Sequence, residues 1–175
     1  MEAAPSGGRV FTSNVDGQFQ TAGFAEEQVV ECHGSIHHLQ CERPCSNALW
    51  SSSYEATWDE ASMRANAPFP LCPDCGAVAR PAILMFADGG WVSSRTDEQD
   101  DALRSFLEAR DLRRTVVIEC GAGSSIPTVR GFGEALLAHG AALVRINPRE
   151  SDGPPGTISL SGGALRLLEA IDALI

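Results

Sequence analysis

Four of the six cysteines fall into two short pairs, and this spacing constrains the fold more than any other feature of the sequence. The pairs are Cys41 with Cys45 and Cys72 with Cys75, and 26 residues lie between them. Two such pairs can supply the four thiolates of a tetrahedral structural zinc site. Gly76, which follows the second pair, allows the backbone to turn toward the ion. The alternative is a set of buried thiols without a metal, but the pairing favours zinc.

Composition excludes several classes of protein. The formal net charge is −10 and all 13 basic residues are arginine, so the chain lacks the cationic excess that nucleic-acid binding requires. Hydrophobic residues make up 43% of the chain, which excludes general disorder. No apolar run approaches the roughly 20 residues of a membrane helix, and residues 1–8 do not resemble a signal peptide. We therefore expect a cytoplasmic, or at least intracellular, protein without membrane or nucleic-acid partners; a nuclear location and the oligomeric state stay open.

The first half of the sequence predicts short elements around an insertion. Residues 1–8 are expected to form a disordered lead, and residues 9–175 one domain. The expected elements are a buried strand at 9–15, a helix at 18–22 capped by Gly23, a strand at 28–32 and an extended apolar run at 82–86. The Ser-rich stretch 46–70 lies between the cysteine pairs, so a zinc module of about 35–80 is expected to be inserted in the domain.

The second half alternates helices and strands. Thr96 is expected to cap a helix whose acidic first turn, 97–101, is solvated. The further expected elements are a buried strand at 115–118, a helix at 128–139 closed by Gly140, a strand at 142–146 and an amphipathic helix at 163–175. This alternation predicts an α/β fold with a Rossmann-like parallel sheet. Cys32 and Cys120 each end an apolar strand, where a small thiol packs well, so neither is expected to bind the metal.

Polar or glycine-rich residues follow three of the predicted strands. They are Asn14 and Asp16, then residues 121–125, and then Asn147. In parallel sheets ligands bind beyond the carboxyl ends of the strands, so three such ends predict a nucleotide crevice. Each end also has a simpler alternative, which is a turn, a tight strand-to-helix connection or a strand cap.

Five segments, taken in order, resemble the sirtuins, which are NAD-dependent protein deacylases. The matching segments are Thr12–Gly23, His33–Gly34, the four paired cysteines, Arg80–Asp88, and Gly121–Gly123 with Ile146–Asn147. The resemblance covers residues 9–175. It implies NAD and zinc as cofactors and an acyl-lysine protein or peptide as the substrate. It also implies that His33 is the catalytic base acting on the NAD ribose, a role that suits imidazole because imidazole titrates near physiological pH.

The resemblance assigns the other site residues in the same way. NAD would be held by Ser13, Asn14, Val15, Asp16, Gly121, Ala122, Gly123, Asn147, Pro148 and Arg149. The substrate peptide would pair by strand addition with Ile83, Leu84, Met85 and Phe86. Zinc would be bound by Cys41, Cys45, Cys72 and Cys75. The alternatives are a hydrogen-bonded structural histidine at His33 and a core strand at 83–86, and His37 and His38 are interpreted as surface or packing residues.

The sequence also departs from the sirtuin pattern. Ser13 replaces a Gln, Ala87 a Gly, and Ala122 and Gly123 a Thr and a Ser, which removes side-chain donors to the cofactor. The first cysteine pair is one residue wider than usual. No segment before Arg9 matches the family's first strand and Gly-Ala-Gly loop, so we expect a sheet incomplete on its N-terminal side and weak turnover until that segment is supplied. Mono-ADP-ribosyl transfer and a non-catalytic zinc-bearing binding module are the alternatives to deacylation.

Overall fold

The computed structural model describes residues 7–174, and the chain divides into two compact units at Leu103 and Arg104. Helix α2 (Ser94–Glu108) carries this boundary, and each unit is described by itself. Most of the expected lead lies outside the described residues, and Gly7 and Gly8 belong to no helix or strand. None of the helices in the described part of the chain has the length and apolar character that a membrane crossing demands.

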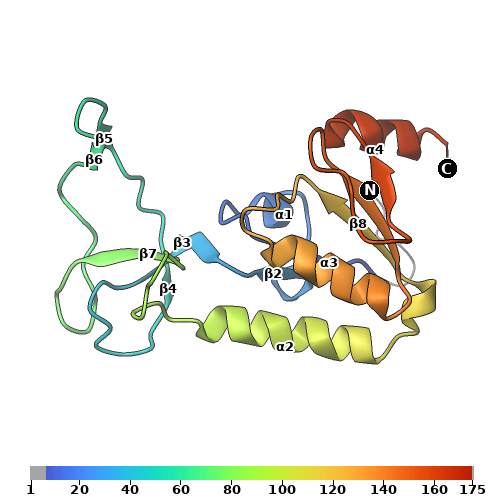
Figure 1. Cartoon of the computed structure of the whole chain (residues 1–175). Helices are drawn as coiled ribbons and strands as arrows, with labels where there is room; N and C mark the ends of the chain where they lie inside the picture. The colour runs from blue at the N-terminus through green and yellow to red at the C-terminus, as the bar shows by residue number, and fades with distance from the viewer. Residues whose placement is uncertain (1–6, 175) are drawn as a thin grey trace. The chain divides into compact units, whose positions relative to one another are not determined.

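The first unit combines small sheets with a short helix, the 3-10 turn η1 (Glu26–Gln28) and the greater part of α2 (Figure 1). Its elements are β1 (Val10–Thr12), α1 (Gln18–Thr21), β2 (Val29–Glu31), β3 (Gly34–Cys41), β4 (Trp50–Ser51), β5 (Trp58–Asp59), β6 (Arg64–Ala65) and β7 (Ala79–Ile83). Strands β1 and β2 are parallel, β3 lies between β4 and β7 in an antiparallel sheet, and β5 pairs with β6. The expected insertion at 46–70 therefore contains only two-residue strands, while β2 and β3 supply buried apolar residues, including Val29, Val30 and Leu39.

Helix α1 ends at the glycine that the sequence singles out. Gly23 has a φ of 98°, a left-handed conformation that glycine adopts without strain. Its N–H donates to the Gln20 carbonyl at 3.0 Å, and the Phe24 N–H donates to the Phe19 carbonyl at 3.1 Å. The Phe19 and Phe24 rings meet edge to face, with centroids 5.9 Å apart. These paired bonds and the apolar contact form a Schellman cap, which confirms the predicted helix end.

Strands β3 and β7 differ from expectation. The periodicity does not predict β3, because a register shift between Ser35 and Leu39 interrupts the alternation of its side chains. Strand β7 begins earlier than predicted and ends at Ile83, so the extended run expected to reach residue 86 is wrong beyond that point. The chain turns there, since the Asp88 N–H donates to the Met85 carbonyl at 3.2 Å. The core alternative for this run is wrong as well, because residues 84–86 are all exposed.

The second unit is an α/β layer structure. Its elements are the 3-10 turn η2 (Leu112–Arg114), β8 (Val116–Cys120), α3 (Thr128–Ala138), β9 (Ala142–Ile146), β10 (Ile158–Leu160) and α4 (Ala164–Asp172). The three strands are parallel in the order β10-β9-β8, which confirms the predicted parallel sheet. Gly140, with a φ of 103°, follows α3 as predicted. Three residues are too short a stretch for a periodic signal, and the sequence pattern does not predict β10.

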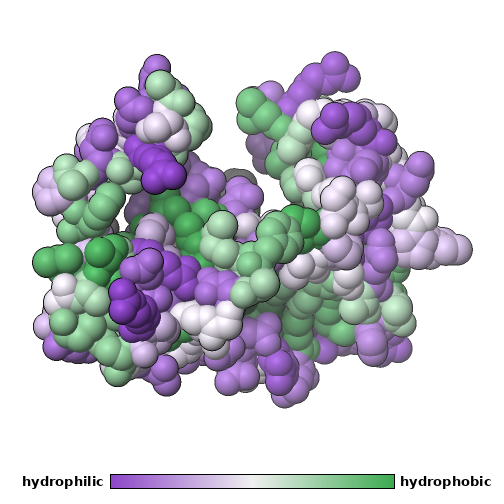
Figure 2. Space-filling model, turned by 60° about the vertical axis from the view of Figure 1, so that its left-hand side comes forward, coloured by the Kyte–Doolittle hydropathy of each residue, from purple (hydrophilic) through white to green (hydrophobic). Residues whose placement is uncertain are grey.

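The two faces of strand β8 have different surroundings. Helix α3 covers one face, where Gly133 lies against Val117 and Glu119 (Figure 1). Val116 and Ile118 lie on the other face and are exposed, so the expectation of a fully buried strand is wrong. The reason is that successive side chains of a strand point to opposite faces, and helix α3 lies only against the face of Val117 and Glu119. Figure 2 shows such hydrophobic side chains, in green, exposed among hydrophilic ones on one face of the molecule.

Candidate functional site

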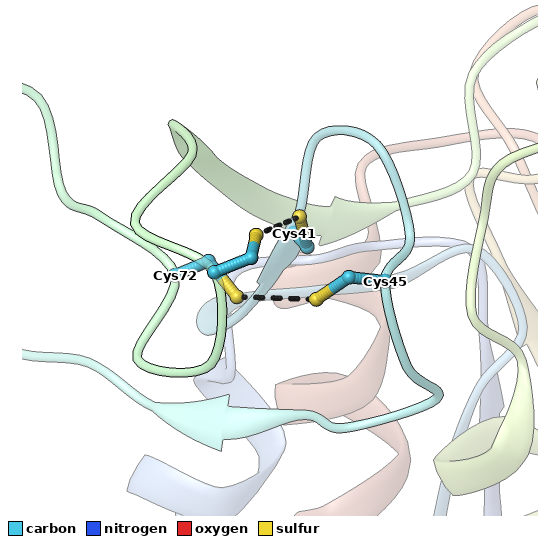
Figure 3. Close-up of side chains that lie close together, drawn as sticks. Cys41, Cys45 and Cys72 are labelled. Atoms are coloured by element: carbon cyan, nitrogen blue, oxygen red, sulfur yellow. Dashed lines mark hydrogen bonds between the residues drawn. The ribbon is translucent and has the colours of Figure 1, made fainter.

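The four paired cysteines converge on one point in the first unit. Their sulfur atoms all lie within 4.8 Å of one another. The Sγ atoms of Cys41 and Cys75 are 3.7 Å apart, and those of Cys45 and Cys72 are 3.6 Å apart. Figure 3 shows the side chains of Cys41, Cys45 and Cys72 directed toward one another. A tetrahedron with zinc–sulfur bonds of about 2.3 Å has edges of about 3.8 Å, and the two closest sulfur pairs match this edge, so small shifts of the thiols would bring all four around one zinc ion.

A tight turn places the second pair of thiols. The Cys72 N–H donates to the Ala77 carbonyl at 2.7 Å, and the Gly76 N–H donates to the Cys72 carbonyl at 2.9 Å. Gly76 has a φ of 71°, which is the turn that the sequence predicts for it. Cys41 ends strand β3 and is paired there with Ala79 of β7. Regular backbone hydrogen bonding therefore fixes both sides of the cluster.

The cluster thiols differ in acidity. Hydrogen bonding from the backbone N–H of Cys75 lowers the pKa of Cys72 to about 7. Hydrogen bonds with the Cys75 and Cys72 sulfurs raise the pKa of Cys45 to about 12. Protein groups alone therefore do not hold four thiolates together at neutral pH. A divalent cation would neutralise them and displace the remaining protons.

The other two cysteines lie outside the cluster. Burial raises the pKa of Cys32 to about 11, and desolvation of its partly covered thiol also raises the pKa of Cys120, although this residue as a whole is exposed. Both side chains are therefore neutral thiols at neutral pH, and neither is grouped with other metal-binding side chains in the described part of the chain. The expectation that neither cysteine is a ligand stays a prediction.

His33 lies in the connection from β2 to β3, and the backbone around it is fixed on both sides. The Cys32 N–H donates to the Thr12 carbonyl at 2.9 Å, and the Leu84 N–H donates to the His33 carbonyl at 3.0 Å. The His33 side chain is half-buried, and its ring makes no hydrogen bond to the described residues. The backbone is thus held while neither imidazole nitrogen makes a hydrogen bond within the described residues, and the assignment of His33 as the catalytic base stays a prediction.

The backbone at position 34 requires a glycine directly after His33. Its φ is 81°, in the left-handed region. A Cβ at this position would lie 1.9 Å from the carbonyl oxygen of Ala82 in β7. Only a residue without a side chain allows β3 and β7 to approach this closely, so the pairing of the two strands depends on Gly34.

Ser13 to Asp16 leave β1 at the edge of the sheet where His33 leaves β2, because the two strands are parallel and in register. The Asp16 carboxylate accepts the Gln18 N–H at 3.2 Å, at the start of α1. The Asn14 side chain is exposed and donates to Asp16 at 3.5 Å. Asp16 therefore acts as a turn former in this structure, as the simpler alternative expects, and the Asn14 amide stays at the surface.

The corresponding loops of the second unit follow neighbouring parallel strands. Residues 121–125 follow β8 and residues 147–149 follow β9. Asn147 is only 7% exposed. Its side-chain N–H donates to the Ala122 carbonyl at 3.1 Å, and its oxygen accepts the Arg149 N–H at 3.0 Å. The Asn147 amide thus ties the two loops together, and its assignment as a ribose ligand stays a prediction.

Two charged residues that contact these loops, Glu150 and Arg130, are not singled out by the motifs. The Glu150 carboxylate accepts hydrogen bonds from Ser124, which lower the pKa of Glu150 below its ordinary value. Arg130 of α3 donates to the carbonyls of Ala122 and Asp152, at 3.2 and 2.7 Å. The sequence signal that could have identified Glu150 is an acidic side chain just beyond a parallel strand, since such residues bind ribose hydroxyls in dinucleotide folds.

The expected substrate segment is a braced loop. Ile83 still pairs with Gly34, whereas the next three residues leave the sheet, and Phe86 is 88% exposed. Arg80 donates to the Ile83 carbonyl at 3.1 Å and forms an ion pair with Asp88 at 2.7 Å. Burial raises the pKa of the Asp88 carboxyl, but its hydrogen bond with Arg80 has the opposite effect, and the pKa is lowered on balance. These contacts of Arg80 hold the two ends of an exposed apolar loop, which lies next to the His33 carbonyl.

Glu31 is a buried carboxylate two residues before His33, and no motif points to it. Its side chain is 2% exposed and forms an ion pair with Arg95 of α2 at 2.6 Å. Thr96 also contacts this residue, because its hydroxyl donates to the Glu31 carbonyl at 3.1 Å. Helix α2 begins at Ser94, so the prediction that Thr96 caps the helix is wrong. The first turn of α2 instead anchors the strand that leads to His33.

Comparisons with known proteins agree with this arrangement. Residues 1–103 match the Sir2 family. The chain belongs to this family. An NAD-dependent protein deacylase of Thermus thermophilus is 30% identical over 159 residues, which are 88% of this chain and 52% of that protein. An NAD-dependent protein deacetylase 2 of Streptomyces coelicolor is 27% identical over 144 residues, which are 79% of this chain and 52% of that protein.

Solved structures show the same fold. A Sir2 homolog in complex with NAD superimposes with a TM-score of 0.70 at 24% identity, covering 95% of this chain and 57% of the other. Sir2Tm bound to a propionylated peptide superimposes with a TM-score of 0.65 at 22% identity, covering 95% of this chain and 63% of the other. The sirtuin fold expected from the motifs is thereby confirmed. The chain spans about half the length of the curated relatives it matches.

Proposed function

We propose that this chain acts in the NAD-dependent deacylation of protein lysine. The observation that carries the proposal is the setting of His33, whose backbone is fixed by Thr12 and Leu84 while its ring has no hydrogen bond to the described residues. Relatives named as NAD-dependent protein deacylase and deacetylase support this activity. Structures of family members with NAD and with an acylated peptide support the two substrates.

The proposed reaction assigns a role to His33 and to the residues that follow β1. NAD, when bound, supplies the ribose that receives the acyl oxygen. A neutral His33 would take the proton of the attacking ribose hydroxyl, as a general base. Asn14, exposed at the carboxyl end of β1, would bind the nicotinamide ribose together with its neighbours Ser13, Val15 and Asp16.

The second unit would bind the adenosine half of the cofactor. No atom of the described residues lies within 4 Å of a Cβ built on Gly121, so a ligand can approach the backbone there. Ala122 and Gly123 continue this turn, and Asn147, Pro148 and Arg149 form the adjacent loop. Parallel strands place both loops at the edge of the sheet where nucleotides bind.

The acyl-lysine peptide would bind along Ile83 and the exposed residues Leu84, Met85 and Phe86. The hydrogen bond from Leu84 to the His33 carbonyl joins this segment to the proposed base. Only Ile83 lies in a strand, so strand addition would order the rest on binding. Exposed apolar side chains beside a braced backbone are suited to that role.

The sulfur cluster would hold zinc as a structural ion. Four cysteine ligands fill a tetrahedron and leave no position for a substrate, so the ion would stabilise the module around residues 41–79. Thiolate ligands must stay reduced, which favours the cytoplasm.

Nicotinamide release from NAD in the presence of an acetyl-lysine peptide tests the proposal. Because weak turnover is expected of the chain by itself, the N-terminal sirtuin segment is supplied fused or in trans. We then expect release that requires the peptide and that falls by about 100-fold or more in complemented His33→Ala, as the loss of a general base predicts. His139→Ala is the matched control, because this exposed histidine lies at the end of α3. Equal release by the wild-type and His33→Ala chains would contradict the role of His33. Peptide binding without any release would favour the binding-module alternative, and labelled ADP-ribose on the peptide would favour transfer.

A further inference from the structure

The imidazole of His37 contacts the loop that carries Asn14 and Asp16. His37 lies in β3, and its Nε2 is 3.1 Å from the carbonyl oxygen of Asp16. A carbonyl oxygen can only accept a hydrogen bond, so Nε2 carries the proton. The next contact runs through the backbone, because the Ile36 N–H donates to the Val15 carbonyl at 2.9 Å.

Gly17 packs directly against the same ring. A Cβ on Gly17 would lie 2.8 Å from Cδ2 and 3.0 Å from Nε2 of His37. The φ of Gly17 is 66°, a left-handed conformation that places its backbone against the imidazole. Strand β3 therefore holds three successive residues of the loop, which are Val15, Asp16 and Gly17. His37 is exposed, yet its ring has a specific partner that a simple surface residue lacks.

We propose that His37 is a positioning residue for the cofactor loop. Its ring N–H fixes the backbone at Asp16 and thereby sets the directions of the Asn14 and Asp16 side chains. The inference rests on the proposed function, since these are the side chains assigned to the nicotinamide ribose. A loop that is already ordered loses less conformational entropy when its ligand binds, so His37 would increase affinity for NAD without touching it.

Two substitutions separate the hydrogen bond from the bulk of the ring. His37→Gln keeps a side-chain N–H donor, whereas His37→Phe keeps a planar ring and loses the donor. His139→Phe is the matched control, because the His139 ring also bonds a backbone carbonyl, that of Ala135 at 2.7 Å, in the second unit. A purely packing role predicts that Phe replaces His37 better than Gln does.

Three measurements on the full chain test the proposal. Long-range ¹H–¹⁵N spectra should show a protonated Nε2 on His37. Amide exchange at Gln18 and Ile36 should accelerate by about 3- to 10-fold in His37→Phe, the range expected for one lost hydrogen bond, and stay near wild type in His37→Gln. Titration with NAD should show a Kd raised by a similar factor in His37→Phe only, with His139→Phe unchanged.

The outcomes distinguish the two proposals. An Nδ1–H tautomer of His37, or unchanged exchange in His37→Phe, would overturn the positioning role. An unchanged Kd for NAD in His37→Phe would overturn it as well. If the exchange pattern holds but the wild-type chain does not bind NAD, the proposed function fails, while the hydrogen bond that orders the loop stands.

Discussion

The carboxylate of Glu150 accepts two hydrogen bonds from Ser124, one from its backbone N–H and one from its hydroxyl, each at 2.9 Å. The two residues belong to the loops that follow β9 and β8. The two donors of Ser124, which could otherwise bind an anionic ligand, are thus used by the chain's own carboxylate. A carboxylate in this place also suits ribose hydroxyls better than a phosphate.

The Ser124–Glu150 contact predicts a specific pH dependence. Its hydrogen bonds lower the pKa of Glu150, so the contact is fully formed above the ordinary pKa of glutamate and is lost as the pH falls through the lowered value. The Ser124 amide proton shift should follow this titration in NMR spectra. Ser124→Ala removes the hydroxyl donor and should move the pKa of Glu150 back toward its ordinary value. An unshifted titration of Glu150 in the wild-type chain would refute the contact.

The sulfur cluster predicts one zinc ion per chain. Cys72→Ser should abolish zinc binding, and structural zinc contributes on the order of 10 kcal/mol to the folding of a small module. Loss of the ion should therefore unfold residues 41–79, with faster amide exchange at Ala79, whose N–H is bonded to the Pro70 carbonyl. Elemental analysis of the pure protein gives the metal content.

Cys120→Ala provides the control for this prediction. Cys120 is exposed at the end of β8 and lies outside the cluster, so its removal should leave the zinc content unchanged. Cys32→Ala should behave in the same way. Loss of zinc in either variant would show that the ligand set is different, and six freely reactive thiols in the wild-type protein would rule out a four-cysteine site.

Local signals predict the parts of the fold that local physics determines. The glycines that end α1 and α3 are read from single positions, because a left-handed backbone favours glycine wherever it occurs. The parallel sheet follows from the alternation of apolar strands and helices. Strand β3 lies beyond such signals, since its bulge breaks the period of two, and the exposure of each face of β8 depends on whether a helix covers that face.

In the candidate site, too, local sequence predicts some features and tertiary packing determines others. Motifs identify backbone segments such as His33–Gly34 and the cysteine pairs. They do not identify side-chain partners that are distant in sequence, because nothing local to Glu31 indicates Arg95, which lies 64 residues away, and Glu150 lies 26 residues from Ser124. Such pairs arise from tertiary packing.

We expect substitution of Gly34 to cause a large loss of stability. Gly34→Ala combines a left-handed backbone with a Cβ that would lie 1.9 Å from the Ala82 carbonyl oxygen, so we expect a cost of about 4 kcal/mol or more. Gly23→Ala is the matched control, because Gly23 is also left-handed but no atom in residues 7–174 lies within 4 Å of its Cβ position. It should cost only about 1–2 kcal/mol. Equal unfolding free energies for the two variants, measured in urea, would contradict the close approach of β3 and β7.

Ala87 predicts a stabilising substitution. It is a non-glycine residue with a φ of 57°, which costs about 1–2 kcal/mol relative to the ordinary conformation. Ala87→Gly should therefore stabilise the loop that follows the proposed peptide segment, by about 1 kcal/mol in urea unfolding. Ala138→Gly at the end of α3 should have the opposite effect, since glycine is unfavourable in a helix. A destabilised Ala87→Gly chain would show that the loop does not adopt this turn.

We expect the stability of the second unit to depend strongly on the charge of Arg145. Its side chain is fully buried and forms two hydrogen bonds with the Glu119 carboxylate, at 2.6 and 2.9 Å, where Glu119 is 2% exposed. Arg145→Met leaves that carboxylate buried without its main partner, so we expect a loss of about 3–5 kcal/mol. Removing both charges in Glu119→Leu/Arg145→Met should restore most of this loss, because a buried ion pair and an apolar pair of similar volume have comparable stability. Circular dichroism during urea unfolding measures all three chains. A double variant no more stable than Arg145→Met would mean that the other contacts of Arg145, with Glu134 and the Asp152 carbonyl, are what hold β9 to its surroundings.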